Sequence, residues 1–421
     1  MNPLQILSNF KQQISNFSIY FLAALIPMIL SLVSNPFLAK NLSPEDYAII
    51  GYYSAFVTLF SPLINFYLLH YYTKRFYELD EDGRIVLKAT LYRALIFFSL
   101  ILSLIAMILM AVYKVLANSD SQIPLFPYAI LSMLSVPLTG IYSLSLTECR
   151  MTRSSKRFFH ISVTNGILGI SLALLLVVAF KFGAVGRMYA TLITALIMFC
   201  YTFYKNRSIW KFPFDKAIFV DSLLFCWPLV IASMLTFFCA GYDKIILEQQ
   251  GDLHTLGIYS VGFTIAGYLS LFSSSINDTF QPDIYESIVK RQIKRCAKFV
   301  IMKLAIMSAC VVAFVIFAPV IINILTFGRY TESAPYAIIV AISSVTSMMY
   351  YSMSQITVAL GYTKITLVNK ILGSVVSIFS FSFLISYFGA MGAAWGVVLS
   401  YMYFFIGNAV MVYYNYRRKS K

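Results

Sequence analysis

Charged side chains are rare in the long apolar stretches of this chain, and the few near the ends of these stretches are the first candidates for chemistry. The basic ones are Arg93, Arg150, Lys303 and Lys370. In an inward-facing cavity such groups could neutralise an anionic headgroup, and arginine is best suited to paired phosphate oxygens. We expect these four to contact a substrate. For Arg93, Lys303 and Lys370 the alternative is a long side chain that reaches the membrane surface.

Two further pairs of polar residues are candidates for a gate or a coupling-ion site. Asp243 and Lys244 lie at the outer end of an apolar segment, where a solvated helix end is the alternative. Neighbours on a helix do not face each other, so the pair need not be ionic. Asn165 and Asn369 lie in similar stretches of sequence far apart in the chain. Hydrogen bonds between helices are the alternative for these two asparagines.

Several kinds of catalytic chemistry lack their sequence signatures here. The chain has no Walker motif, glycine-rich nucleotide loop, metal-ligand cluster or nucleophile elbow. Its six cysteines show no metal-ligand spacing and predict no disulfide framework. We therefore expect no enzyme activity, no metal and no cofactor. Energy for any transport would come from an H+ or Na+ gradient or from the substrate itself.

The elements that must position these residues are membrane-spanning helices. Of the 421 residues, 60% are apolar and only 12% are charged, against about 25% charged in soluble domains. The mean hydropathy is +0.78. The net charge of +15 is dispersed along the chain, so it does not predict a nucleic-acid surface. The composition predicts an integral membrane protein embedded in a lipid bilayer.

A helix needs about 20 mostly apolar residues to cross the hydrocarbon. Twelve segments meet this need: 17–38, 48–70, 89–113, 126–148, 161–180, 188–204, 218–240, 257–281, 299–325, 335–358, 366–386 and 392–414.

Basic residues indicate which side of the membrane each gap faces. Of the 32 Lys and Arg residues, 24 lie at the two ends and in every second gap, namely 71–88, 149–160, 205–217, 282–298 and 359–370. Cytoplasmic loops carry an excess of Lys and Arg. The pattern therefore predicts that both termini are cytoplasmic.

The chain also contains an internal repeat. Residues 165–169 (NGILG) resemble residues 369–373 (NKILG), 204 positions later, and residues 182–186 (FGAVG) resemble residues 388–392 (FGAMG), 206 positions later. Two matches at nearly one offset predict two six-helix halves of parallel topology, residues 1–210 and 211–421. Substrate sites of repeat-built transporters lie at the interface of the repeats. The expected fold is thus an all-α membrane protein with twelve transmembrane helices.

Four motifs, in this order, resemble those of a known family. They are NPFLAKNLSPEDY at 35–47, WPLV at 227–230, GYDKIIL at 241–247 and LGIY at 256–259. The first resembles the first outer loop of polysaccharide transporters, and the others resemble the seventh segment and the start of the eighth. The chain is similar in this way to the Wzx-type O-antigen and capsule flippases, in the superfamily that also holds multidrug exporters and peptidoglycan-precursor flippases.

The resemblance implies a function in O-antigen or lipopolysaccharide biosynthesis. Such a flippase moves an oligosaccharide linked by pyrophosphate to undecaprenol from the cytoplasmic to the periplasmic leaflet of the bacterial inner membrane. It works by alternating access, and polymerase and chain-length proteins of the pathway are implied partners. Two alternatives stay open: a cation-coupled small-molecule exporter of the same fold, and a membrane O-antigen polymerase or ligase. The short gaps disfavour the latter, which typically carries a large catalytic outer loop.

Overall fold

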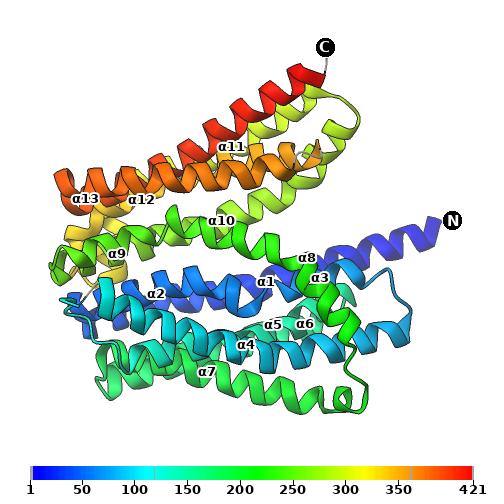
Figure 1. The fold of residues 1–421 in the computed structure, drawn as a ribbon, viewed down its shortest axis with the longest axis horizontal. Helices are drawn as coiled ribbons and strands as arrows, with labels where there is room; N and C mark the ends of the chain where they lie inside the picture. Colours follow the sequence, from blue (N-terminus) through cyan, green and yellow to red (C-terminus); the bar gives the residue numbers. More distant parts are fainter. Residues whose placement is uncertain (1–2, 118, 361–362, 420–421) are drawn as a thin grey trace. The chain divides into compact units, whose positions relative to one another are not determined.

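The chain folds into long α-helices (Figure 1). The computed structural model describes residues 3–117, 119–360 and 363–419, and these ranges contain no strand. The first helices are α1 (Pro3–Asn41), α2 (Pro44–Asn65), α3 (Leu68–Arg75), α4 (Glu81–Ala117), α5 (Tyr128–Met151), α6 (Ser155–Ala173) and α7 (Gly183–Lys205). They are followed by α8 (Lys216–Met234), α9 (Tyr242–Gln249), α10 (Leu253–Val289), α11 (Ile293–Thr326), α12 (Ala334–Ala359) and α13 (Thr363–Lys419). The all-α class predicted from the hydropathy is confirmed.

The lengths of these helices follow from the apolar runs. Ten helical stretches of the described residues are long and apolar enough to cross a membrane. One of them lies in α13, which is 57 residues long and has a non-helical residue, Gly389 (φ +56°, ψ −136°), inside it. Gly389 falls in the predicted gap between the last two segments. The chain is a multi-pass membrane protein, while the count of twelve and the cytoplasmic termini stay predictions.

Short irregular pieces interrupt the membrane helices at points that hydropathy does not mark. Phe66 and Tyr67 have left-handed backbone angles (φ +46° and +52°) and separate α2 from α3 inside one predicted segment. A π-helix, η1 (Leu174–Ala179), follows α6, and a 3-10 helix, η3 (Leu235–Phe238), follows α8. The gap predicted at 241–256 is not irregular throughout, because it contains α9.

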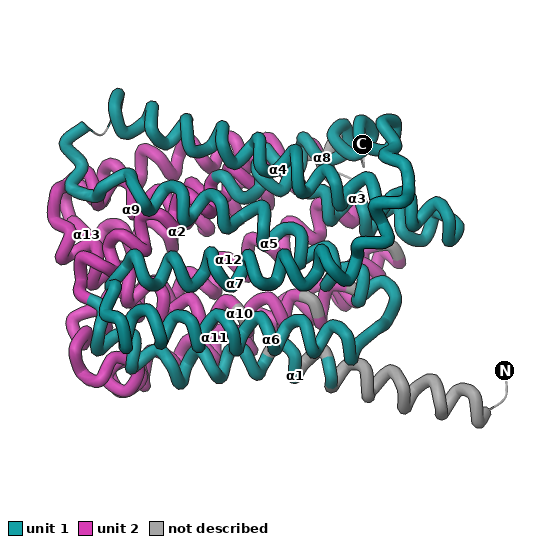
Figure 2. The backbone as a smooth tube through the Cα atoms, turned by 90° about the horizontal axis from the view of Figure 1, so that it is seen from below, with its two compact units in different colours: residues 1–42, 60–231 teal, residues 43–59, 232–421 magenta. Residues whose placement is uncertain are grey.

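The chain forms two compact units (Figure 2). The first contains residues 1–42 and 60–231, and the second contains residues 43–59 and 232–421. Helix α1 packs against α6, and α5 against α7, in the first unit; α12 packs against α10, α11 and α13 in the second. These units differ in extent from the sequence halves 1–210 and 211–421, which the internal repeat defines and which stay a prediction.

The first unit has an aromatic core where α3 meets α4 and α5. Tyr71, Tyr72 and Tyr92 are buried there together with Leu91 and Leu144. This packing places the polar end of Tyr71 beside the start of α8, where its hydroxyl donates a hydrogen bond to Asp221.

The second unit is packed tightly where residues 43–59 lie against α10. A Cβ atom added to Gly257 would lie 1.9 Å from the carbonyl oxygen of Pro44, and one added to Gly51 would lie 2.3 Å from Oγ of Ser260. Real Cβ atoms do not approach other atoms so closely, so only glycine fits at these two contacts. The first part of α2 is therefore held against α10 within this unit.

Candidate functional site

A cavity of about 610 Å³ lies within the second unit, between α10, α12 and α13. Small-molecule sites are usually cavities of about 300–1,000 Å³ with a few well-placed polar groups. Twelve lining residues carry a hydroxyl or amide group: Ser270, Ser273, Ser274, Asn277, Tyr285, Ser343, Ser344, Ser347, Tyr351, Ser354, Gln355 and Tyr401. None of the described lining residues is Asp, Glu, Lys, Arg or His. The cavity wall combines these hydroxyl and amide groups with apolar surface and carries no formal charge on the described lining side chains.

Several of the serine hydroxyls donate their proton to the backbone of their own helix. The hydroxyl of Ser270 donates to the carbonyl oxygen of Gly267 (2.6 Å), that of Ser343 to Val340 (2.6 Å), and that of Ser347 to Ser344 (3.0 Å). A hydroxyl oxygen that has donated still has lone pairs with which it can accept. At these three positions the hydroxyl oxygen therefore presents a hydrogen-bond acceptor to the cavity.

Two amide side chains of the cavity wall lie in contrasting surroundings. The Oδ1 atom of Asn277 is buried and has no hydrogen-bond partner among the described residues. The Oε1 atom of Gln355, by contrast, accepts a hydrogen bond from Nζ of Lys303 at 3.1 Å. Lys303 itself is fully buried and does not line the cavity. Its link to the cavity wall is the hydrogen bond to Gln355.

The predicted gate or coupling pair lies at a break in the helical path. Gly241 (φ +152°) separates η3 from α9, and its N–H donates to Oδ1 of Asp243 at 2.7 Å. Tyr259 donates its hydroxyl proton to Oδ2 of Asp243. Nζ of Lys244 lies 3.6 Å from Oδ2 of Asp243. Both charged side chains are buried, so the alternative of a solvated helix end is wrong, and the two do form an ion pair.

The Asp243–Lys244 pair and the cavity share one side chain. Nζ of Lys244 lies 3.5 Å from the centre of the Phe263 ring, and Phe263 lines the cavity. A cation over an aromatic face is attracted by the ring's quadrupole. The ion pair is thus in contact with the back of the cavity wall, while its role as a gate or coupling site stays a prediction.

Lys370 lies near the same break. Its Nζ donates to the carbonyl oxygen of Ala232 (2.7 Å) and to Oγ1 of Thr236 (3.1 Å). Ser374 donates to the carbonyl oxygen of Leu235 at 3.1 Å. Two polar side chains of α13 thus donate to carbonyl groups at the end of α8 and in η3, where the helical path is interrupted.

The remaining basic candidates lie in the first unit. Arg93 donates to the carbonyl oxygens of Trp210 (2.9 Å) and Phe212 (2.7 Å), and it lies over the Trp210 ring. Arg150 is exposed and lies over the ring of Phe158. None of the four predicted basic residues lines the cavity of the second unit. Their contact with a substrate stays a prediction.

Both predicted asparagines make hydrogen bonds between helices. The amide nitrogen of Asn369 donates to the carbonyl oxygen of Phe404 at 2.7 Å, which joins the two parts of α13 on either side of Gly389. Asn165 of α6 is hydrogen-bonded to Tyr142 of α5. The alternative of interhelical bonds is confirmed for these two residues, and a gate function stays untested.

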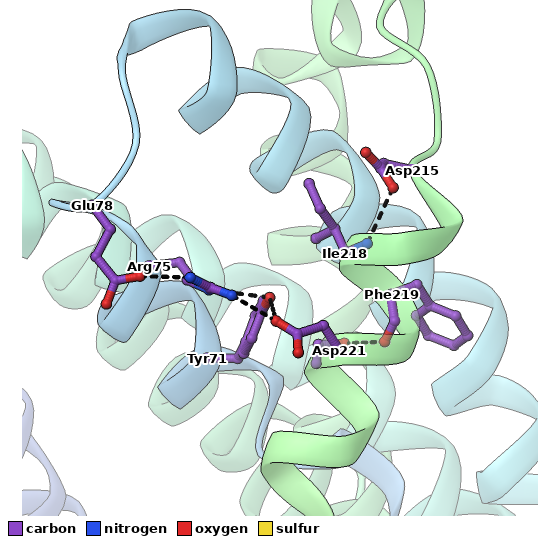
Figure 3. A network of polar contacts seen from close by, with 8 residues as sticks. Tyr71, Arg75, Glu78, Asp215, Ile218, Phe219 and Asp221 are labelled. Carbon is purple, nitrogen blue, oxygen red and sulfur yellow. Dashed lines mark hydrogen bonds and ion pairs between the residues drawn. The ribbon is translucent and has the colours of Figure 1, made fainter.

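A second polar network belongs to the first unit (Figure 3). Arg75 donates to Glu78 (2.7 Å) and to Asp221 (2.8 Å), and Tyr71 also donates to Asp221 (2.6 Å). The network joins α3 to α8 and borders a smaller cavity of about 330 Å³. Arg75 and Asp221 are more than one third exposed, so this ion pair contributes little on its own.

Reasoning from charge missed the serine-lined cavity. The sequence did carry a signal for it: Ser270, Ser273, Ser274 and Asn277 recur at three- and four-residue intervals, which places them on one face of a helix. Ser343 and Ser347 repeat this spacing on α12.

The long apolar helices define a multi-pass membrane protein, and solved structures of transporters show which fold these helices form. The structure is similar to that of an inward-facing multidrug resistance MATE family transporter of the multidrug/oligosaccharidyl-lipid/polysaccharide (MOP) superfamily (TM-score 0.68, 15% identity, 95% of this chain and 98% of that one). It is also similar to the lipid II flippase MurJ in an inward closed conformation (TM-score 0.66, 15% identity, 93% and 87%). At these identities the likeness shows the fold alone.

The chain belongs to the polysaccharide biosynthesis protein family, whose sequence model matches residues 14–286. It is 22% identical to the Lsg locus putative protein 1 of Haemophilus influenzae over 282 residues, which are 65% of this chain and 66% of that relative. It is 24% identical to an uncharacterized membrane protein of the same organism over 303 residues, 67% of each chain. The chain thus matches about two thirds of the length of these relatives.

Proposed function

We propose that this protein is a flippase of the bacterial inner membrane. Its substrate is an oligosaccharide linked through pyrophosphate to undecaprenol, of the O-antigen repeat-unit type. The protein moves the glycan from the cytoplasmic to the periplasmic leaflet by alternating access, while the polyprenyl tail stays in lipid. It is a transporter and carries out no bond chemistry of its own.

One observation carries this proposal: a member of the polysaccharide biosynthesis family contains a cavity whose wall includes twelve residues with hydroxyl or amide groups. A glycan moved through hydrocarbon must exchange the hydrogen bonds it makes with water for others, because unpaired polar groups are costly in an apolar medium. A wall rich in serine, tyrosine and amide groups provides such replacements. The flippase fold of the lipid II transporter MurJ is consistent with a lipid-linked substrate.

The predicted partners and energy source extend this proposal. Polymerase and chain-length proteins of the same pathway would receive the product, and an H+ or Na+ gradient is the proposed energy source. Among the described residues no group of three or more His, Cys, Asp and Glu side chains could hold a metal ion. The buried Asp243–Lys244 pair, together with Asn165 and Asn369, is the proposed coupling or gate element.

Deletion of the gene in its native host tests the proposed function. We expect lipid-linked repeat units to accumulate on the cytoplasmic face, surface polymer to disappear, and a plasmid copy of the gene to restore it. The control is a strain that lacks the polymerase, in which single repeat units still reach the surface. Normal surface polymer after deletion, or the loss of drug resistance alone, would contradict the flippase function and favour a small-molecule exporter.

The predicted phosphate contacts need a separate test. A variant in which Arg93, Arg150, Lys303 and Lys370 are all replaced by glutamine should fail to restore surface polymer if these residues bind the headgroup. Because Arg93 and Lys370 also satisfy backbone carbonyls, the membrane content of the variant must be measured alongside. Full restoration of polymer would remove the four residues from the substrate path.

A further inference from the structure

We propose that the cavity of the second unit is a subsite for uncharged, hydroxyl-rich sugar residues, and that Lys303 is a positioning residue that fixes Gln355 as a hydrogen-bond donor to them. This inference rests on the proposed flippase function. It adds where the glycan binds, what chemistry the wall selects, and which part of the substrate the cavity does not hold.

The direction of the hydrogen bonds favours a ligand rich in donors. The hydroxyls of Ser270, Ser343 and Ser347 donate to carbonyl groups of their own helices, so toward a ligand they can only accept. Each sugar hydroxyl has a proton to donate. A wall that offers hydroxyl acceptors at these three positions is therefore complementary to the donors of a sugar ring.

The same wall disfavours the pyrophosphate. Phosphate oxygens that are ionised can only accept hydrogen bonds, and they are stabilised by basic side chains. None of the described residues that line the cavity is basic. Placing a pyrophosphate among serine acceptors would leave its charge unpaired, which is costly. The pyrophosphate must therefore be held elsewhere on the protein.

Gln355 supplies the complementary donor. An amide side chain has an acceptor oxygen and a donor NH2 group, and the surrounding hydrogen bonds decide which way it points. The ammonium group of Lys303 has only donors, so it must bond to Oε1, and it lies 3.1 Å from that atom. The NH2 group of Gln355 is then the part of the amide left to face the cavity. It suits an acceptor such as a hydroxyl, ring or acetamido oxygen.

Aromatic rings complete the wall. Tyr351 and Tyr401 both line the cavity, with ring centres 6.5 Å apart and planes at 51°. Ligand sites combine apolar and aromatic surface with a few polar groups that fix orientation. The C–H face of a sugar ring can pack against such tyrosines while its hydroxyls reach the serines of α10 and α12.

The test compares two natural lipids on the purified, full-length protein in phosphatidylcholine nanodiscs. One probe is the lipid-linked repeat unit extracted from the host, and the other is undecaprenyl pyrophosphate, which has no sugar. We expect the wild type to bind the glycolipid at least tenfold more tightly. Ser347→Phe places a larger side chain in the cavity. In this variant the affinity for the glycolipid should fall to that for the sugar-free lipid, and the affinity for the sugar-free lipid should not change.

Gln355→Glu distinguishes the loss of a hydrogen-bond donor to the ligand from a loss of protein stability. The carboxylate keeps its contact with Lys303, so the melting temperature should not fall, but it presents an acceptor to the cavity instead of a donor. We expect glycolipid affinity to fall about five- to tenfold. Lys303→Met removes the contact that orients the Gln355 amide, so it should lower the affinity for the glycolipid by a smaller factor. Gln292→Glu, in the exposed connection between α10 and α11, is the matched control and should bind as the wild type does.

The outcomes separate the two proposals. If Ser347→Phe, Gln355→Glu and Lys303→Met weaken the binding of both lipids equally, or weaken the binding of neither lipid, the cavity is not a sugar subsite and the inference is overturned. If Gln355→Glu leaves glycolipid affinity unchanged, the donor assignment is wrong. The deletion phenotype, by contrast, decides the flippase function without reference to these affinities, because it is measured on the polymer at the cell surface.

Discussion

At the scale of the residue, Lys370 has a structural task that its charge did not predict. It donates to the carbonyl oxygen of Ala232 and to Thr236 at the helix break. Lys370→Met would remove the 2.7 Å hydrogen bond to the carbonyl oxygen of Ala232, which would keep the longer contact of 3.5 Å with Oγ1 of Thr236. Loss of a hydrogen bond from a charged donor costs about 1.5–3 kcal/mol. We expect a lower melting temperature for the detergent-solubilised protein. Lys364→Met, at an exposed position of the same helix, is the control, and equal melting temperatures for the two variants would contradict the assignment.

Individual residues also show the limit of prediction from sequence. The charge of Lys303 was visible, but its partner Gln355 lies 52 positions away, and only packing of α11 against α12 brings them together. Hydrogen-bond partners of this kind depend on tertiary structure. The serines of the cavity were overlooked because uncharged side chains cost little to insert and therefore do not stand out.

At the scale of the element, α10 begins with a charged N-cap. Asp252 accepts from the N–H of Thr255 at 3.0 Å and from its hydroxyl. These hydrogen bonds hold the pKa of Asp252 below its ordinary value of 3.8. A carboxyl with a lowered folded pKa stabilises the protein above its unfolded pKa, and this stabilisation is lost as pH falls through the folded value.

Substitutions at this cap should separate the loss of the acceptor from the loss of the charge. Asp252→Ala should lower the free energy of unfolding by about 0.5–2 kcal/mol. Asp252→Asn keeps an acceptor and should lower the free energy of unfolding by only a few tenths of a kcal/mol, through the loss of the negative charge at the helix N-terminus. The melting-temperature difference between wild type and Asp252→Asn should be present at pH 7 and shrink below about pH 4, near the ordinary pKa of a carboxyl. A difference that stays constant down to pH 3 would show that the ionised form of Asp252 is not what matters.

The contact of α2 with α10 gives a second prediction for an element. A Cβ on Gly257 would lie 1.9 Å from the carbonyl oxygen of Pro44, whereas one on Gly267 of the same helix has nothing within 4 Å. Gly257→Ala should therefore destabilise the protein by about 1–3 kcal/mol through overpacking, while Gly267→Ala should not. Thermal unfolding in detergent measures both. Similar melting temperatures would mean that residues 43–59 are not held against α10.

At the scale of the whole molecule, the charge pattern predicts a topology that can be mapped. A green fluorescent protein fused to the C-terminus should fluoresce, because it folds in the cytoplasm. A cysteine placed in the basic gap 149–160 should react with an impermeant maleimide only after the cells are opened. The same cysteine in the gap 114–125 should react in intact cells, and the reverse labelling would invert the predicted orientation.

Hydropathy predicted the all-α membrane fold because the length of an apolar run is a local property of the sequence. It did not predict the interruption at Phe66 and Tyr67, where no glycine or proline marks the left-handed backbone. Those angles are held by the surrounding aromatic core, including Tyr71 and Tyr72. The cavity likewise arises only when α10, α12 and α13 pack together.

The serine hydroxyls tethered to their own helices have an evolutionary consequence. Because Ser270, Ser343 and Ser347 bond to the backbone of the helix that carries them, each acceptor is independent of its neighbours on other helices. An exchange of serine for alanine at one of these positions removes one acceptor and leaves the helix packing intact. If the cavity holds the glycan as we propose, single exchanges at these serines would change which carbohydrate is recognised, one contact at a time, on an unchanged scaffold.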